Sequence, residues 1–150
     1  MQKFDLIIVG GSAAATSAGI YAARRNLKFK IISKDFGGEV ATSGEIGNWP
    51  GINQTDGLTL ASQFKEHLKF YKADMEEGIE VEKISKQNDG LFCITAKTGK
   101  EVGQASEKLT EDGNFAPKCD YIAKAVIITT GVRPRELNVP GEKELRNKGV

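Results

Sequence analysis

The sequence predicts an α/β fold in which a parallel sheet carries an inserted antiparallel meander. Two runs, Asp5–Val9 and Ala125–Thr129, are almost entirely apolar and are expected to be strands; the first is typical of a strand buried on both faces, in the centre of a parallel sheet. A helix and another strand follow the first run, so a βαβ unit closes within about 30 residues. From Gly78 onward the residues alternate as in antiparallel strands, and this change indicates the insertion.

The elements of the βαβ unit and the helix after it can be assigned in order. The first helix is expected over Ala13–Arg25, and Phe29–Ser33 is expected to be the second strand. A further helix begins after a cap at Thr55 or Asp56 and continues to about Ala73. The helical spacing of its apolar residues predicts one buried stripe: Leu60, Phe64, Leu68 and Tyr71.

The insertion is expected to contain a β-hairpin. Its strands are Ile79–Val81 and Leu91–Thr95, and the turn Asn88-Asp89-Gly90 lies between them. The polar segment Lys97–Lys118 is expected to be a long hairpin tip or a further insertion. Tyr121 and Ile122 then begin another strand, ahead of the apolar one at 125–129.

The composition fits an ordinary soluble domain and excludes several classes of protein. The chain has 150 residues, 39% of them hydrophobic and 27% charged. Its formal net charge of +1 gives no broad attraction to nucleic acid or to an anionic membrane. No apolar run approaches the roughly 20 residues that span a bilayer, and no signal peptide is recognisable. The default expectation is therefore a cytoplasmic protein without nucleic-acid or membrane partners.

Cys93, Cys119 and His67 show no pattern typical of a metal site or of catalysis. The two cysteines are too far apart in sequence for a CxxC pair, and we expect both to be small buried hydrophobic residues. The single histidine lies beside the apolar stripe, and we expect it to be solvated. No zinc site is predicted.

The turn after the first strand is the strongest local motif. Gly10-Gly11-Ser12-Ala13-Ala14-Ala15 stands where a dinucleotide fingerprint G-x-G-x-x-G/A would lie, between a strand and a helix. A helix N-terminus there would offer N–H groups to a pyrophosphate. Ser12 occupies the second glycine position, and its hydroxyl could also donate to a phosphate oxygen. A close-packed turn without a ligand remains the alternative.

Two other features bear on a nucleotide site. The acidic residue expected about 20 residues later, for the ribose, is not clearly present. Asp35 could serve, or Ser33 more weakly, although Asp35 also fits an exposed turn. The glycine-rich segment Gly37–Ile52 is longer than a routine connection, and long ordered loops are often functional.

Three stretches, in this order, resemble the FAD domain of the thioredoxin reductases, within the pyridine nucleotide-disulfide oxidoreductases. They are DLIIVGGSAAATSAGIYAARRNLK, GGEVATSGEIGNWPGI and AVIITTGVRPRELNVPGE. The resemblance implies a Rossmann-like FAD-binding domain, with residues 1–150 as its N-terminal part and the meander at roughly 78–124. The family's NAD(P)H domain, with its CxxC pair, and the C-terminal segment of the FAD domain are not in this sequence.

The resemblance also implies an FAD site, position by position. The pyrophosphate would lie on Gly10, Gly11, Ser12, Ala13 and Ala14. The adenosine ribose would meet Ser33 and Asp35, and the adenine would lie near the backbone of Lys83. The ribityl chain and ring would pass Gly37, Gly38, Glu39 and Val40. The flavin would be approached by Ser43, Ile46 and Asn48. The cofactor would rest above Thr129, Thr130 and Gly131.

Two residues depart from the family pattern: Ser12 stands for the usual glycine, and Glu39 stands for the usual glutamine. A carboxylate near a reduced flavin would disfavour the anionic hydroquinone and lower the reduction potential, unless a cation pairs with it.

The implied activity is electron transfer from NADPH or NADH through FAD to a disulfide, and then to a thioredoxin-like protein or a small disulfide. The full-length protein would be a homodimer. No catalytic residue is expected in this segment, since the flavin and the cysteines would do the chemistry. The alternatives are a nucleotide-binding fragment without turnover, and a flavoprotein of the ferredoxin–NADP reductase type that lacks a redox disulfide.

Overall fold

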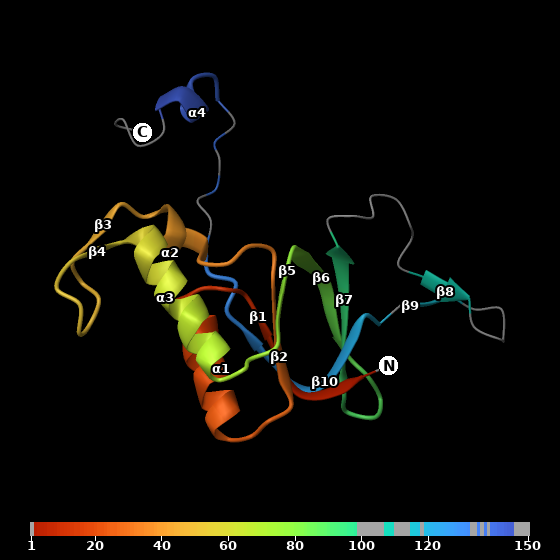
Figure 1. Cartoon of the computed structure of the whole chain (residues 1–150). Coiled ribbons are helices and arrows are strands. Elements are labelled where there is room, and N and C mark those ends of the chain that lie inside the picture. The colour runs from red at the N-terminus through yellow and green to blue at the C-terminus, as the bar shows by residue number, and fades with distance from the viewer. Residues whose placement is uncertain are drawn as a thin grey trace.

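A six-stranded sheet forms the centre of the molecule (Figure 1). In spatial order its strands are β5 (Met75–Glu77), β2 (Phe29–Ser33), β1 (Lys3–Val9), β10 (Tyr121–Ile128), β7 (Phe92–Thr98) and β6 (Ile79–Lys86). The first four strands are parallel, whereas β7 is antiparallel to both β10 and β6. The predicted α/β class with an antiparallel insertion is confirmed.

The structure, a computed structural model, describes residues 2–98, 107–109, 115–117, 119–132, 135, 137 and 139–145. Within the polar segment Lys97–Lys118, it places two short antiparallel strands, β8 (Glu107–Leu109) and β9 (Phe115–Pro117). The rest of that predicted tip or insertion, from residue 99, lies outside the described residues. Among the described residues, no helix has both the length and the apolar character needed to cross a membrane.

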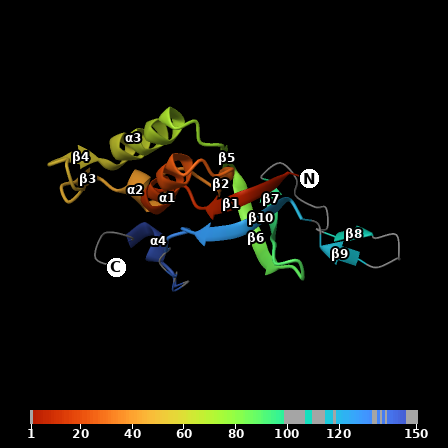
Figure 2. The ribbon, with the colours of Figure 1, turned by 90° about the horizontal axis from the view of Figure 1, so that it is seen from below.

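The central strands β1 and β2 are covered by different elements on their two faces. Helices α1 (Ala13–Arg24) and α3 (Gly57–Phe70) lie side by side on one face (Figure 2). Their buried residues pack with Leu6, Ile8 and Ile31 of the central strands. On the other face, Ile79 of β6 and Ile94 of β7 pack against Phe4, Ile7 and Val9 of β1 and against Ile32 of β2. From Leu6 to Val9, successive residues of β1 thus face the two cores alternately, as expected for a strand buried on both faces.

Both long helices begin and pack as the sequence predicted. Helix α1 packs closely because Gly19 has no side chain: a Cβ there would lie 2.8 Å from Ile31 and from Leu68. Helix α3 begins after Asp56, whose carboxylate accepts from the Thr59 amide at 2.9 Å. The predicted stripe on α3 is buried, apart from the half-buried Tyr71. Helix α3 ends at Phe70, three residues before the predicted Ala73.

The glycine-rich segment after β2 is more structured than an open loop. It contains a short helix, α2 (Gly38–Thr42), and a two-stranded sheet of β3 (Glu45–Ile46) and β4 (Thr55–Asp56). Trp49 lies with its ring 5.0 Å from that of Phe64 on α3. This contact agrees with the interpretation of Trp49 as a residue that packs the loop. Further on, the chain ends its described part in the short helix α4 (Glu142–Leu145).

The prediction for the last strand was wrong in its division. Residues 121–128 form one strand, β10, rather than a strand from Tyr121 and a second over 125–129. Although the second half of β10 is apolar, it is partly exposed: Ile127 is 40% exposed and Ile128 is 66% exposed. The reason is pairing: β10 lies along β1 throughout, but it pairs with β7 only from Tyr121 to Ala123.

The sheet also contains an edge strand that the sequence did not predict. β5 pairs in parallel with β2 through Met75, Glu76 and Glu77. Lys30 on β2 holds it by ion pairs to Asp74 at 3.3 Å and to Glu76 at 3.0 Å. Strand β6 follows directly, begins at Ile79 as predicted, and is longer than predicted.

The expectation for the cysteines was only half right. Cys93 is buried as predicted, with 1% of its surface exposed, but it is not a free thiol. It forms a disulfide with Cys119, across a Cα–Cα distance of 5.4 Å. The pairing of β7 with β10 brings the two residues together, since Cys93 lies opposite Ile122. His67 is exposed, as expected.

Candidate functional site

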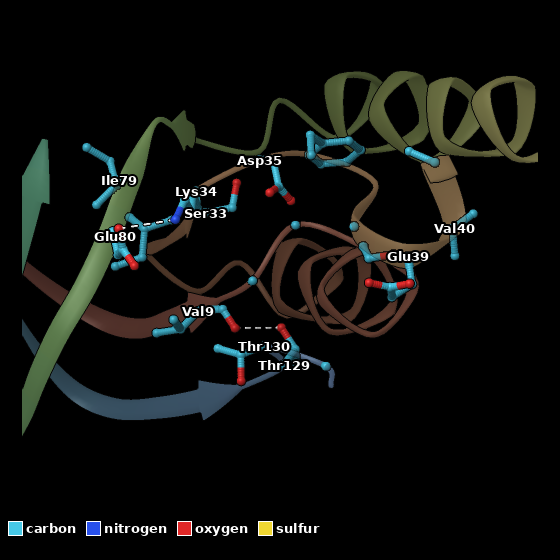
Figure 3. Close-up of a pocket in the computed structure, with 18 of the residues that line it drawn as sticks. Val9, Ser33, Lys34, Asp35, Glu39, Val40, Ile79, Glu80, Thr129 and Thr130 are labelled. Carbon is cyan, nitrogen blue, oxygen red and sulfur yellow. Dashed lines mark hydrogen bonds and ion pairs between the residues drawn. The ribbon is translucent and has the colours of Figure 1, made fainter. Parts of the chain in front are cut away.

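A pocket of about 850 Å³ opens where β1, β2 and β10 end (Figure 3). Its volume lies within the range of small-molecule and cofactor sites, and the carboxyl ends of parallel strands are where α/β sheets bind ligands. More than half of the predicted site residues line it: Gly10, Gly11, Ser12, Ser33, Asp35, Gly38, Glu39, Val40, Thr129, Thr130 and Gly131. Their individual roles stay predictions.

The turn after β1 presents bare main chain to this pocket. Gly10 has φ +124°, and a Cβ there would lie 2.3 Å from the carbonyl oxygen of Thr129. Thr129 is fixed by its own amide and hydroxyl, which both donate to the Val9 carbonyl at 2.8 Å. A Cβ on Gly11 would lie 2.6 Å from the carbonyl oxygen of Asp35. Close packing by itself therefore requires glycine at both positions. The pocket also opens beside this turn.

The electrostatics at the start of α1 favour an anion. The first N–H groups of a helix have no partner within the helix, and the helix dipole adds a partial positive charge. Helix α1 carries no acidic residue in its first turn to neutralise that charge. The predicted residues Ala13 and Ala14 form this first turn, although neither is among the pocket-lining residues. Their backbone, rather than their side chains, is the group that a phosphate would use.

The end of β2 supplies a neutral group to the pocket. Ser33 is 5% exposed and lines the pocket, as does the exposed Asp35. Between them, Lys34 makes an ion pair with Glu80 of β6 at 3.3 Å, which Figure 3 shows at one end of the site. The pocket is therefore lined at this point by both groups that the sequence offered for a ribose, a buried serine and an exposed acid.

Helix α2 forms another wall and brings Glu39 and Val40 to the pocket. Gly37 and Gly38 lead into it with φ +97° and +52°. Gly37 itself does not line the pocket, and its amide donates to the Gly11 carbonyl at 2.7 Å. The Ser12 hydroxyl donates to the Gly37 carbonyl at 2.6 Å, so in this structure it is not aimed at a phosphate as the sequence had suggested.

Besides Ala13, Ala14 and Gly37, four further predicted residues are not on the pocket wall: Ser43, Ile46, Asn48 and Lys83. The first three lie at or beyond the end of α2, and Asn48 is exposed. Lys83 lies further along β6, past a register shift between Val81 and Lys83. The pocket meets β6 at Ile79, Glu80 and Val81 instead. The position of β5 beside β2 places the start of β6 there, and no sequence pattern had indicated β5.

Comparisons with known proteins agree on one family. Residues 4–150 match the family described as "Pyridine nucleotide-disulphide oxidoreductase". The chain is 33% identical over 149 residues to an alkyl hydroperoxide reductase component (its F subunit) from Pseudomonas putida, covering 99% of this chain and 25% of that protein. It is 32% identical over 149 residues to the NADH dehydrogenase of Bacillus subtilis (strain 168), with the same coverage of 99% and 25%.

A solved structure gives the same result for the fold. The thioredoxin reductase of T. acidophilum superimposes with a TM-score of 0.73 at 34% identity, covering 99% of this chain and 42% of that chain. The present chain therefore spans about a quarter of the length of the curated relatives. It spans about two fifths of the length of the solved structure.

Proposed function

Because the chain belongs to the pyridine nucleotide-disulphide oxidoreductase family, we propose that its pocket binds FAD. In the whole protein, electrons would pass from NADPH or NADH through the flavin to a disulfide. The observation that carries this proposal is the pocket itself, which meets bare main chain at the turn between β1 and α1. A diphosphate needs such a turn, because a side chain there would keep it away from the helix N-terminus.

The described residues fit FAD as binding and orienting groups. The diphosphate would lie against Gly10, Gly11 and the first turn of α1. The adenosine ribose would meet Ser33, and the flavin end would lie toward α2, with Glu39 and Val40. FAD supplies the electron-carrying chemistry when bound. This part of the chain positions the cofactor and contributes no proposed nucleophile or general base.

The acceptor and the partners of the whole protein are proposed on family grounds. A thioredoxin-like protein or a small disulfide would receive the electrons, in a homodimer located in the cytoplasm. The thioredoxin reductase of T. acidophilum supports the first choice. The curated relatives are named for other activities, those of an alkyl hydroperoxide reductase and an NADH dehydrogenase.

The visible absorbance of the purified chain tests cofactor binding. We expect a flavin spectrum, and we expect mass spectrometry of the nucleotide released on denaturation to identify FAD. Addition of NADPH or NADH to the 150-residue chain then tests whether this segment alone accepts electrons. Because the family's NAD(P)H domain is not in this sequence, we expect no bleaching of the flavin, and bleaching would exclude a binding module without turnover.

Two variants test where the cofactor lies. Ser12→Leu places extra carbon atoms at the turn, so we expect it to bind FAD at least tenfold more weakly than Ser12→Gly, equivalent to about 1.4 kcal/mol or more. The measurement is a fluorescence titration of the apoprotein with FAD, with far-UV circular dichroism to confirm that both variants fold. Equal affinity in both variants would show that the turn does not approach the cofactor.

A further inference from the structure

Ser12 connects two glycine-rich segments that are 25 residues apart in sequence. Its hydroxyl donates to the carbonyl oxygen of Gly37 at 2.6 Å. In the other direction, the amide of Gly37 donates to the carbonyl oxygen of Gly11 at 2.7 Å. The peptide groups of Gly37 are thus bonded on both sides to residues 11 and 12. We call these two hydrogen bonds the Ser12–Gly37 clamp.

The backbone at Ser12 does not explain the serine. Its φ of −120° and ψ of −156° are extended values that any residue adopts, so glycine is not required there. Ser12 is the N-cap residue of α1, yet its side chain makes no capping hydrogen bond. A serine at this position usually accepts from an amide of the first turn. Here the hydroxyl proton is directed to another segment of the chain.

The segment that the clamp holds is a wall of the pocket. Gly37 is the N-cap residue of α2, whose Glu39 and Val40 line the pocket together with Ala41 and Thr42. The helix is too short to be stable by itself. It therefore depends on its contacts at both sides.

On its other side, α2 is held by α3. A Cβ on Gly37 would lie 2.9 Å from the Cβ of Ala61 on α3. A Cβ on Gly57 would lie 2.0 Å from the carbonyl oxygen of Val40. The close contact with α3 fixes the back of α2, whereas the clamp fixes its beginning against the first turn.

We propose that Ser12 is a positioning residue that holds α2 against the first turn through the Ser12–Gly37 clamp and so fixes one wall of the cofactor pocket. The expected effect on FAD binding rests on the proposed function, whereas the clamp itself does not. A serine hydroxyl has one proton to donate. Because Gly37 accepts it, Ser12 acts on the cofactor through α2 rather than as a donor to phosphate. The serine hydroxyl then stabilises the wall of the pocket, which a glycine at this position could not do.

Hydrogen exchange of the full chain without FAD tests the clamp directly. The peptide covering residues 36–43 is followed by mass spectrometry in the wild type, Ser12→Ala, Ser12→Gly and Ser12→Thr. We expect Ser12→Ala and Ser12→Gly to exchange about 2- to 12-fold faster, from the loss of one hydrogen bond. Ser12→Thr keeps the hydroxyl and restores slow exchange. Ser17→Ala, which removes an exposed serine from the same helix, exchanges like the wild type.

Equal exchange in the wild type, Ser12→Ala and Ser12→Gly would overturn the proposal, as would a failure of Ser12→Thr to restore protection. FAD titration of the same variants gives the second readout. We expect Ser12→Ala and Ser12→Gly to bind FAD about 2- to 12-fold more weakly, and Ser12→Thr to bind like the wild type. Tighter binding by Ser12→Gly would also overturn the proposal. A chain that binds no FAD in any form contradicts the proposed function, while the exchange rates still decide the clamp.

Discussion

At the scale of single residues, Gly10 is a position where both the packing and the backbone conformation require glycine. Gly10→Ala adds a carbon 2.3 Å from the Thr129 carbonyl oxygen and strains a backbone at φ +124°. We expect it to lower the free energy of unfolding by about 2–5 kcal/mol, measured by urea denaturation. Gly90→Ala is the matched control, because Gly90 has φ +82° and no atom within 4 Å of the added carbon. Equal losses in the two variants would contradict the close contact between the first turn and the end of β10.

Glu39 is the residue whose charge should act on the cofactor. Its carboxylate lines the pocket on α2, where the flavin end of FAD is proposed to lie. We expect Glu39→Gln to raise the two-electron reduction potential of the bound flavin by roughly 30 mV, equivalent to ~1.4 kcal/mol, because it removes a negative charge that opposes reduction. Figure 3 shows Glu80 at the opposite end of the pocket, so Glu80→Gln is the control with a smaller shift. A dye-coupled potential measurement that finds the larger shift for Glu80→Gln would contradict this orientation of the cofactor.

At the scale of elements, the disulfide between β7 and the start of β10 should stabilise the sheet. It closes a loop of 26 residues, and the lost entropy of the unfolded chain predicts about 3–4 kcal/mol. Reduction of the wild type should lower the free energy of unfolding by this amount, whereas a reductant should not affect the double variant Cys93→Ser/Cys119→Ser. An unchanged urea midpoint, together with two titratable thiols, would contradict the bond. Disulfides are uncommon in cytosolic proteins, so the thiol count also bears on the predicted cytoplasmic location.

The start of α3 should be sensitive to acid. The hydroxyl and amide of Thr59 donate to the Asp56 carboxylate, and they lower its pKa below the usual 3.8. The ionised carboxylate therefore stabilises the folded state above that pH, and this stabilisation is lost as the pH falls through the lowered pKa. We expect the wild type to lose more stability than Asp56→Ser between neutral pH and about pH 3, since serine caps a helix without titrating. Parallel stability curves in acid would show that the cap contributes nothing.

The sequence predicted the elements whose pattern is local and failed where pairing decided the outcome. The apolar run of β1, the glycine turn and the stripe of α3 are local signals, and each predicted its element. β5 has only three residues, two of them glutamates; it pairs with the main chain of β2, and Lys30 adds ion pairs to Asp74 and Glu76. The disulfide likewise depends on β7 lying beside β10. Neither long-range pairing is visible in a single sequence.

At the scale of the whole molecule, the difference between local sequence patterns and long-range pairing also decides which parts of the pocket could be predicted. The three stretches that resemble the thioredoxin reductases supply the turn after β1, α2 and the end of β10, and the sheet topology brings them to one place. Lys83 was predicted from the resemblance alone, and the structure puts Ile79, Glu80 and Val81 on the pocket instead. The glycine turns that line the pocket could therefore be predicted from the sequence. Which residues of the meander line it depended on how β6 returns to the sheet.

The measurement that tests the central claim most directly is an NMR titration of the ¹⁵N-labelled chain with FAD. It follows the backbone amides from Gly10 to Ala15, where a diphosphate would accept hydrogen bonds from the main chain. We predict that these amides show the largest shifts, together with those of α2. FAD binding that leaves the amides of residues 10–15 unchanged, or no binding at all, would contradict the account.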